Sequence, residues 1–169
     1  MMKVIFVDRD DTIIINKDYL DTPDGIDLLP NAVKGLKAIM DKGYTLIMIT
    51  NQSGINRGYF TLETLDAIHA KLCGILAEGG VRLEKIYFCP HRPDEHCHCR
   101  KPETGMLEQA CSDYDIDLEH SAMIGDSEGD IKMAKRFGIK AIQVTYGIRP
   151  ALPDADIVCN DLLEAADRI

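Results

Sequence analysis

Two aspartates, Asp8 and Asp10, follow directly after the apolar run Val4-Ile5-Phe6-Val7. A short run of β-branched and aromatic residues predicts a buried strand of a parallel sheet, and ligands of such sheets bind beyond the carboxyl ends of the strands. Side chains two residues apart on an extended chain point to the same side, so both carboxylates would face one site. Two carboxylates that lie so close repel each other unless a cation or a proton lies between them.

Three later segments also place polar residues after apolar runs or beside a proline. A hydroxyl, an amide and a glycine turn in Thr50-Asn51-Gln52-Ser53-Gly54 could present hydrogen-bond donors to an oxyanion. Arg100-Lys101-Pro102 supplies two cations, and Gly125-Asp126-Ser127-Glu128-Gly129-Asp130 supplies a second carboxylate pair. Any one of these segments could be an ordinary turn or helix cap, but their succession along one chain indicates a single site.

These residue types suit phosphoryl transfer. A carboxylate can attack phosphorus to form an aspartyl-phosphate, and Mg²⁺ is commonly held by one or two carboxylates, waters and a substrate phosphate. We expect Asp8 to be the nucleophile, and Asp10 to protonate the leaving oxygen and later deprotonate the attacking water. Asp126 would hold the metal. Asp130 would either contact the metal ligands without binding the metal itself or orient Lys101. The side chains expected to neutralise the transferring group are those of Thr50, Asn51 and Lys101.

The chain has 169 residues, enough for one domain with its own core, and we expect residues 1–169 to form a single phosphatase domain. Its net charge of −9 does not attract nucleic acid or an anionic membrane. No apolar run approaches the length of a membrane span, and the first residues lack the layout of a signal peptide. We therefore expect a cytoplasmic monomer that acts on a small phosphorylated metabolite.

Apolar strand-like runs alternate with segments of helical spacing, which predicts βαβ units around a parallel sheet. The expected strands are 4–7, 45–49, 86–89, 122–124, 141–144 and 157–159, and the expected helices are 31–42, 61–78, 105–114, 129–137 and 161–168. Asn31 and Thr61 are suitable N-caps, and Gly43 and Gly138 are suitable helix ends. The stretch 12–30 has no sustained period and predicts a loop over the strand ends. The predicted fold is a three-layer, Rossmann-like α/β fold with helices on both faces of the sheet and no cap domain.

Cysteine and histidine are concentrated in the segment 89–99. Cys89-Pro90-His91 and Cys97-His98-Cys99 are two pairs with one residue inside each and five residues between them. Three thiolates and one imidazole suit a closed tetrahedral Zn²⁺ site, which is structural rather than catalytic. This zinc loop would fix the cations that follow it, Arg100 and Lys101. His96 and His98 are alternative ligands, and a loop without metal is the alternative interpretation.

The four polar segments, in this order and over nearly the whole chain, resemble the haloacid-dehalogenase-like phosphohydrolases. The resemblance implies that Asp8 is the nucleophile and Asp10 the acid/base. It also implies that Mg²⁺ is bound by Asp8, by the backbone carbonyl of Asp10 and by Asp126. Asp11 departs from the family pattern, in which glycine usually stands, and its negative charge beside the nucleophile could lower turnover.

The zinc loop narrows the resemblance to two groups, the D-glycero-D-manno-heptose 1,7-bisphosphate 7-phosphatases and the histidinol-phosphatases. The segments 50–60 and 100–107 are similar to the heptose group, whereas the short spacer inside the zinc loop is nearer to the histidinol-phosphatases. A sugar bisphosphate needs a second anion site, which Arg57, Arg100 or Lys17 could supply. The expected substrate contacts are Asn16, Tyr19, Gln52, Ser53, Arg57 and Arg100.

The heptose resemblance implies removal of the 7-phosphate in the biosynthesis of a cell-surface polysaccharide precursor. Histidinol phosphate, which presents an ammonium and an imidazole group, is the alternative substrate. An open site could also admit a macromolecular substrate. A zinc-loop interaction protein that has lost catalysis is a more remote alternative, which Asp11 supports slightly and the intact Asp8, Asp10, Lys101 and Asp126 oppose. Tyr19 could simply pack its loop.

Overall fold

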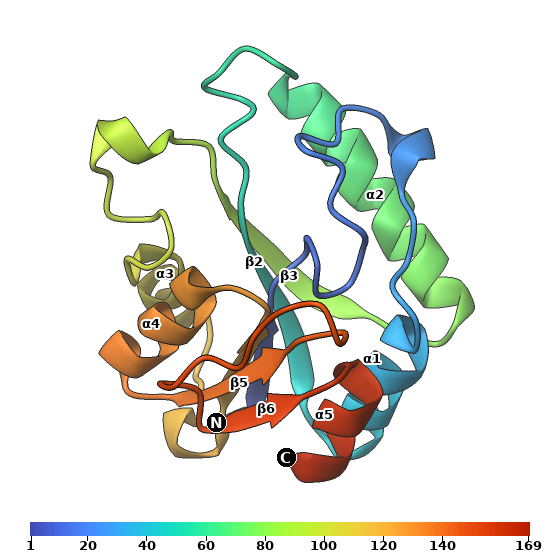
Figure 1. The fold of residues 1–169 in the computed structure, drawn as a ribbon, viewed down its shortest axis with the longest axis vertical. Helices are drawn as coiled ribbons and strands as arrows, with labels where there is room; N and C mark the ends of the chain where they lie inside the picture. Colours follow the sequence, from blue (N-terminus) through green and yellow to red (C-terminus); the bar gives the residue numbers. More distant parts are fainter.

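Six strands form one parallel sheet in the order β3-β2-β1-β4-β5-β6 in the computed structural model, which describes residues 1–169 (Figure 1). Every neighbouring pair of strands is parallel. The strands are β1 (Val4–Val7), β2 (Thr45–Asn51), β3 (Leu83–Cys89), β4 (Ala122–Gly125), β5 (Lys140–Val144) and β6 (Ile157–Cys159). The predicted Rossmann-like sheet is confirmed, and β3 begins at Leu83, earlier than expected.

Helices cover both faces of this sheet (Figure 1). The helices are α1 (Ala32–Asp41), α2 (Leu62–Glu78), α3 (Gly105–Asp113), α4 (Glu128–Phe137) and α5 (Leu162–Arg168). One core cluster joins the sheet to α1, α2 and α5, and the other joins it to α3 and α4. Strand β1 contributes Ile5 and Val7 to the first cluster and Val4 and Phe6 to the second. Burial on both faces explains why this strand is an unbroken apolar run.

The helix ends follow the sequence signals at most positions. The Thr61 hydroxyl accepts a hydrogen bond from the backbone N–H three residues on and so caps α2 as predicted. Gly43 and Gly138 take left-handed φ values of 85° at the ends of α1 and α4. Asn31 occupies the N-cap position of α1 as predicted, but its backbone is left-handed (φ 62°) and its side chain makes no capping hydrogen bond. Its amide instead donates to the Asp161 carboxylate at 2.7 Å.

The carboxyl ends of β1, β2 and β4 meet at one edge of the sheet. Val7 pairs with Met48 on one side and with Ile124 on the other. The next residue, Asp8, donates its backbone N–H to the Ile124 carbonyl at 3.0 Å. The segment 12–30 follows as a loop with one short 3₁₀ turn (Pro23–Gly25), which packs against α2. No helix of this fold is both long and apolar enough to cross a bilayer.

Candidate active site

Lys101 lies at the centre of a buried ion-pair cluster at this sheet edge. Its Nζ is 2.7 Å from an oxygen of Asp8 and 2.6 Å from an oxygen of Asp130, and it donates to the Ile49 carbonyl at 3.1 Å. Only 4% of the lysine side chain is exposed. Burial by itself would lower the pKa of Lys101, but the negative charges of Asp130 and Asp8 outweigh it and raise this pKa above its ordinary value. Lys101 is therefore a permanent cation beside Asp8.

Three buried carboxylates share this cluster. Asp8, Asp126 and Asp130 each place an oxygen within 4.8 Å of the others. Burial, followed by the charge of Asp130, raises the pKa of Asp8 well above its ordinary value and raises that of Asp126 to about 6. Two cations, Lys101 and Arg149, contact these three carboxylates, so one negative charge remains, and carboxylate oxygens are the donors that Mg²⁺ prefers. The donor set therefore fits a divalent cation.

Asp130 is committed to contacts within the protein. One oxygen accepts from Lys101, and the other accepts from the backbone N–H of Ser127 at 3.1 Å and from its hydroxyl at 2.7 Å. The bond from the Ser127 N–H, together with the return bond from the Asp130 N–H to the Ser127 hydroxyl at 3.4 Å, forms a capping box at the start of α4. Of the two roles predicted for Asp130, its contacts fit the orientation of Lys101.

The carboxylate of Asp10 is held by two side chains. Arg9 donates to one oxygen through Nε at 3.2 Å and Nη2 at 3.0 Å, and Gln52 donates to the other at 3.1 Å. Arg9 is only 1% exposed, and its Nη1 lies 3.3 Å from Nε2 of His69 on α2. Burial, followed by the charge of Arg9, lowers the pKa of His69 to about 3, so this ring is neutral at pH 7.

Arg9 and His69 are site residues that the sequence reasoning missed. The sequence did contain a signal for Arg9. Side chains alternate along an extended chain, so the residue between two aspartates that face the site points away from it and into the protein. His69 also lies on the apolar face of α2, among its buried residues. Their pairing depends on the tertiary fold, which the local pattern does not contain.

Thr50 and Asn51 also bind neighbouring protein groups. The amide of Asn51 accepts the backbone N–H of Lys101 at 3.0 Å and donates to the Lys101 carbonyl at 3.3 Å. This pair of bonds fixes the segment that carries the lysine. Thr50 is fully buried, and its hydroxyl accepts a hydrogen bond from Gln52 at 2.8 Å.

Two adjoining clefts open over these groups. One has a volume of about 230 Å³ and is lined by Asp8, Asp10, Asp11, Asn16, Asn51, Lys101, Asp126, Ser127 and Arg149. The other has a volume of about 260 Å³ and is lined by Arg9, Asp10, Asn16, Asp18, Tyr19, Asn51, Gln52, Ser53 and Arg100. Asp10, Asn16 and Asn51 line both, so the two clefts share one wall. The structure thus brings most of the predicted site residues together.

Three predicted residues, Thr50, Arg57 and Asp130, do not line either cleft. Arg57 stacks over the ring of Tyr19 at 5.6 Å and donates to the Ser53 hydroxyl at 3.2 Å. Lys17, which was considered as a second cation, also lies outside both clefts and pairs with Asp27 at 2.5 Å. Of the three candidate cations for a second anion, only Arg100 lines the cleft beside Asp10.

Asp11 occupies a backbone position that favours glycine, with φ of 57°. Its carboxylate pairs with Arg149 at 2.8 Å and accepts the backbone N–H of Asn16 at 3.1 Å. Arg149 also pairs with Asp126 at 2.9 Å. The sequence reasoning missed this arginine, which lies 138 residues further along the chain. The extra negative charge of Asp11 is therefore partly offset by a cation that Asp11 shares with Asp126.

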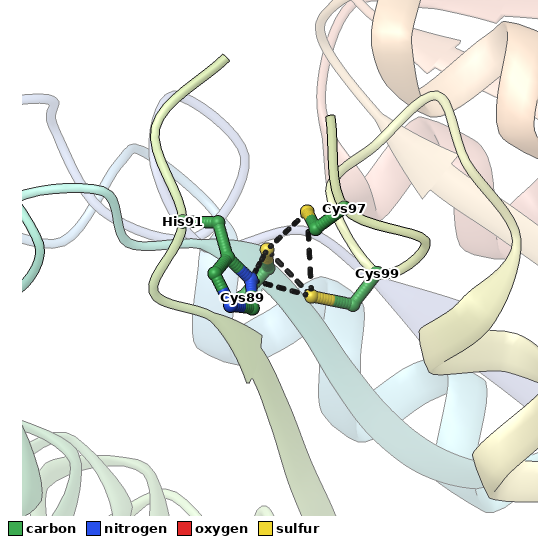
Figure 2. A group of neighbouring side chains, drawn as sticks. All are labelled: Cys89, His91, Cys97 and Cys99. Carbon is green, nitrogen blue, oxygen red and sulfur yellow. Dashed lines mark hydrogen bonds between the residues drawn. The ribbon is translucent and has the colours of Figure 1, made fainter. Parts of the chain in front are cut away.

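The zinc-loop residues converge in space, as Figure 2 shows. The sulfurs of Cys89, Cys97 and Cys99 and Nδ1 of His91 all lie within 4.8 Å of one another. The contacts range from 2.7 Å between the sulfurs of Cys89 and Cys99 to 3.7 Å between those of Cys97 and Cys99. All cysteines are free thiols. The cluster is compatible with a zinc site.

The alternative zinc ligands face elsewhere. His98 Nε2 bonds an oxygen of Glu108 at 2.9 Å, and His96 is exposed. The cluster is also tied to the cleft, because Arg100 donates its backbone N–H to the Cys97 sulfur at 3.4 Å and its Nη1 to the His91 carbonyl at 3.3 Å. The zinc loop and the cation that lines the cleft therefore form one connected segment.

Comparisons with known proteins agree with this architecture. A family model described as HAD-hydrolase-like matches residues 98–165. The D-glycero-beta-D-manno-heptose-1,7-bisphosphate 7-phosphatase of Pseudomonas putida is 37% identical over 171 residues, covering 98% of each chain. A probable D-glycero-D-manno-heptose-1,7-bisphosphate 7-phosphatase of Thermoplasma volcanium is 42% identical over 138 residues, covering 80% of this chain and 93% of the relative.

A solved structure shows the same similarity in three dimensions. It is the D,D-heptose 1,7-bisphosphate phosphatase of B. bronchiseptica, complexed with magnesium and phosphate. It superimposes with a TM-score of 0.89 at 35% sequence identity, covering 99% of this chain and 97% of the other.

Proposed function

Because the chain belongs to the HAD-like phosphatase family, we propose that it is a Mg²⁺-dependent phosphatase that removes the 7-phosphate of D-glycero-D-manno-heptose 1,7-bisphosphate. The observation that carries this proposal is the buried cluster in which Lys101 binds Asp8 at 2.7 Å while Asp126 lies beside it. This cluster provides a nucleophile, a fixed cation and metal ligands at one sheet edge. The full-length similarity to heptose bisphosphate phosphatases indicates the substrate.

In the first step, the second oxygen of Asp8 attacks phosphorus while Lys101 holds the first. The bond between phosphorus and the ester oxygen breaks, and the proton of the Asp10 carboxyl passes to that oxygen. In the second step, Asp10 takes a proton from water as the water oxygen attacks phosphorus. The acyl-phosphate bond then breaks, which releases phosphate and restores Asp8.

Mg²⁺, when bound, neutralises charge on the transferring phosphoryl group. The residues that would hold it are Asp8, Asp126 and Asp10 through its backbone carbonyl. Asn51 and Asp130 contribute by fixing Lys101, one through its backbone and the other through its Nζ.

Arg100 is the proposed contact for the second phosphate. It lines the cleft together with Asp10, Asn16 and Tyr19, whereas Arg57 and Lys17 lie outside it. A guanidinium group binds phosphate well through its planar fork of donors. The 7-phosphate would therefore lie over Asp8 while the 1-phosphate reaches towards Arg100.

Histidinol phosphate is a second candidate because Asp18 also lines this cleft and could bind an ammonium group. Arg100 opposes this assignment, since two cations in one cleft repel each other. Heptose bisphosphate fits the charge of the cleft better.

The zinc loop has a structural role in this proposal. Zn²⁺ bound by Cys89, His91, Cys97 and Cys99 would occupy all four positions of a tetrahedral site and leave none for substrate. It would fix Arg100 and Lys101, which follow the last ligand directly. We further propose that residues 1–169 act as one monomeric phosphatase domain in the cytoplasm. Size-exclusion chromatography of the purified chain tests whether it is a monomer.

The experiment is a substrate panel with Mg²⁺. We expect kcat/KM for heptose 1,7-bisphosphate to exceed that for histidinol phosphate, and both activities to disappear in Asp8→Asn. An Arg100→Met variant should lose most of the preference for the bisphosphate because it lacks the second cation. A higher kcat/KM for histidinol phosphate would overturn the substrate assignment but retain the phosphatase.

A further inference from the structure

Arg9 is a buried cation that the proposed reaction does not use. It is 1% exposed, and its partners come from three parts of the fold: Asp10 beside it, Gln52 after β2, and His69 on α2. A charge is costly to bury unless its donors are bonded in good geometry. Here Nε and both terminal nitrogens of the guanidinium are bonded.

The contact with His69 fixes the orientation of this guanidinium. An arginine only donates hydrogen bonds, so Nε2 of His69 accepts from Nη1 and the ring proton lies on Nδ1. The guanidinium is planar and rigid. Once Nη1 is held from α2, the directions of Nε and Nη2 are set, and both point at the same oxygen of Asp10.

Gln52 completes a closed ring of hydrogen bonds around Asp10. Its carbonyl oxygen accepts from Arg9 at 3.1 Å, and its amide nitrogen donates to the second oxygen of Asp10 at 3.1 Å. The same nitrogen donates to the buried Thr50 hydroxyl at 2.8 Å, which fixes the amide. Both oxygens of Asp10 are therefore held, and the plane of its carboxyl group is defined.

On the basis of the phosphatase function proposed above, we propose that His69 and Arg9 are positioning residues that aim the Asp10 carboxyl at the leaving-group oxygen. His69 lies outside both clefts, and each guanidinium nitrogen of Arg9 is bonded within the protein although Arg9 lines one cleft, so both residues act through Asp10. In the step concerned, the P–O ester bond breaks, Asp8 gains the phosphoryl group, and the proton of Asp10 passes to the departing oxygen.

This role makes a prediction that depends on the leaving group. A sugar alkoxide is strongly basic and must be protonated as it departs, whereas 4-nitrophenolate departs without a proton. Because kcat/KM reports the first irreversible step, misplacing Asp10 should lower kcat/KM for heptose bisphosphate and for simple alkyl phosphates. It should leave kcat/KM for 4-nitrophenyl phosphate nearly unchanged.

The test compares His69→Leu, which removes the acceptor, with His69→Gln, whose carbonyl oxygen can replace Nε2. We expect His69→Leu to lower kcat/KM for alkyl phosphates by about tenfold, since a misplacement of about 1 Å can cost up to about a hundredfold. The same variant should stay within about twofold of the wild type on 4-nitrophenyl phosphate, because that leaving group gains little from general-acid catalysis. His69→Gln should restore the alkyl phosphate rate. Arg9→Lys keeps the positive charge but lacks the planar fork of donors. It should lose kcat/KM on alkyl phosphates but not on 4-nitrophenyl phosphate, and it provides the test if His69→Leu does not fold.

Equal losses on both kinds of ester would show a merely structural role and overturn the proposal, as would an unchanged alkyl phosphate rate. Failure of the proposed function gives a different result, in which the wild type itself releases no phosphate from either ester with Mg²⁺. Asp10→Asn removes the acid itself and serves as the reference variant. It should show the same difference between the two kinds of ester, with a larger loss of kcat/KM on alkyl phosphates.

Discussion

Replacing Lys101 by Met should destabilise the protein far more than replacing an exposed lysine in an ion pair of the same length. Lys101 lies 2.6 Å from Asp130 and 2.7 Å from Asp8, with 4% of its side chain exposed. Lys135 lies at the same 2.6 Å from Asp156 with 45% exposed, and is the matched control. Removing one partner of a buried pair costs about 3–5 kcal/mol because the other charge stays buried. An exposed pair contributes at most about 1 kcal/mol.

The assay is urea unfolding of both variants, first without and then with Mg²⁺. Without the metal, we expect Lys101→Met to lose at least about 2 kcal/mol more unfolding free energy than Lys135→Met. Added Mg²⁺ should reduce this difference, since a divalent cation neutralises the carboxylates that the lysine leaves behind. Lys101→Met should also lose about a hundredfold or more in kcat, as happens when a fixed group that stabilises the transition state is removed. Equal destabilisation of the two variants would show that the buried ion pairs of Lys101 stabilise the protein no more than an exposed pair.

Three further perturbations test other parts of the structure. Asp11→Gly relieves a left-handed backbone but loses the exposed ion pair with Arg149. The free energy of unfolding measured in urea should therefore change by less than about 1 kcal/mol. A larger loss would show that the pair stabilises the fold more than its exposure suggests. Cys97→Ser should lower zinc content, thermal midpoint and activity together, whereas Cys73→Ser, outside the cluster, should leave all three unchanged; full activity without zinc would contradict a coupling between the zinc loop and the cleft. His69 has a pKa of about 3 when folded against an ordinary 6.5, so it contributes stability that is complete above pH 6.5 and lost as the pH falls towards 3. The wild type should therefore lose unfolding free energy on acidification faster than His69→Gln, by up to about 1.4 kcal/mol per pH unit, and parallel pH profiles would contradict this.

The strands and helices were predictable because their signals are local. The run Val4–Val7 is apolar throughout since β1 is buried on both faces, and the long helix over 61–78 begins at a threonine that caps it. The positions of Asp8 and Asp126 followed from the same signals, because parallel strands end at one edge of the sheet. These residues could be placed in one site without any structure.

The supporting contacts could not be predicted in this way, because each joins residues far apart in sequence. His69 meets Arg9 across 60 residues, and Arg149 meets Asp11 across 138. Asn31 stands at the N-cap position of α1, yet its amide bonds Asp161, the N-cap residue of the neighbouring α5, instead of capping its own helix. In each case the tertiary fold determines the partner. It therefore determines whether a polar side chain caps a helix, positions another side chain or neutralises a charge.

The proposed mechanism requires Asp8 to carry the phosphoryl group during turnover. The experiment mixes the protein with heptose 1,7-bisphosphate and Mg²⁺, quenches the reaction in acid within one turnover, and measures the mass of the peptide that contains Asp8 by mass spectrometry. We predict that this peptide gains one phosphoryl group in the wild type, that the gain persists longer in Asp10→Asn, and that it is absent in Asp8→Asn. Phosphate release without any gain on this peptide, or continued turnover by Asp8→Asn, would exclude Asp8 as the nucleophile.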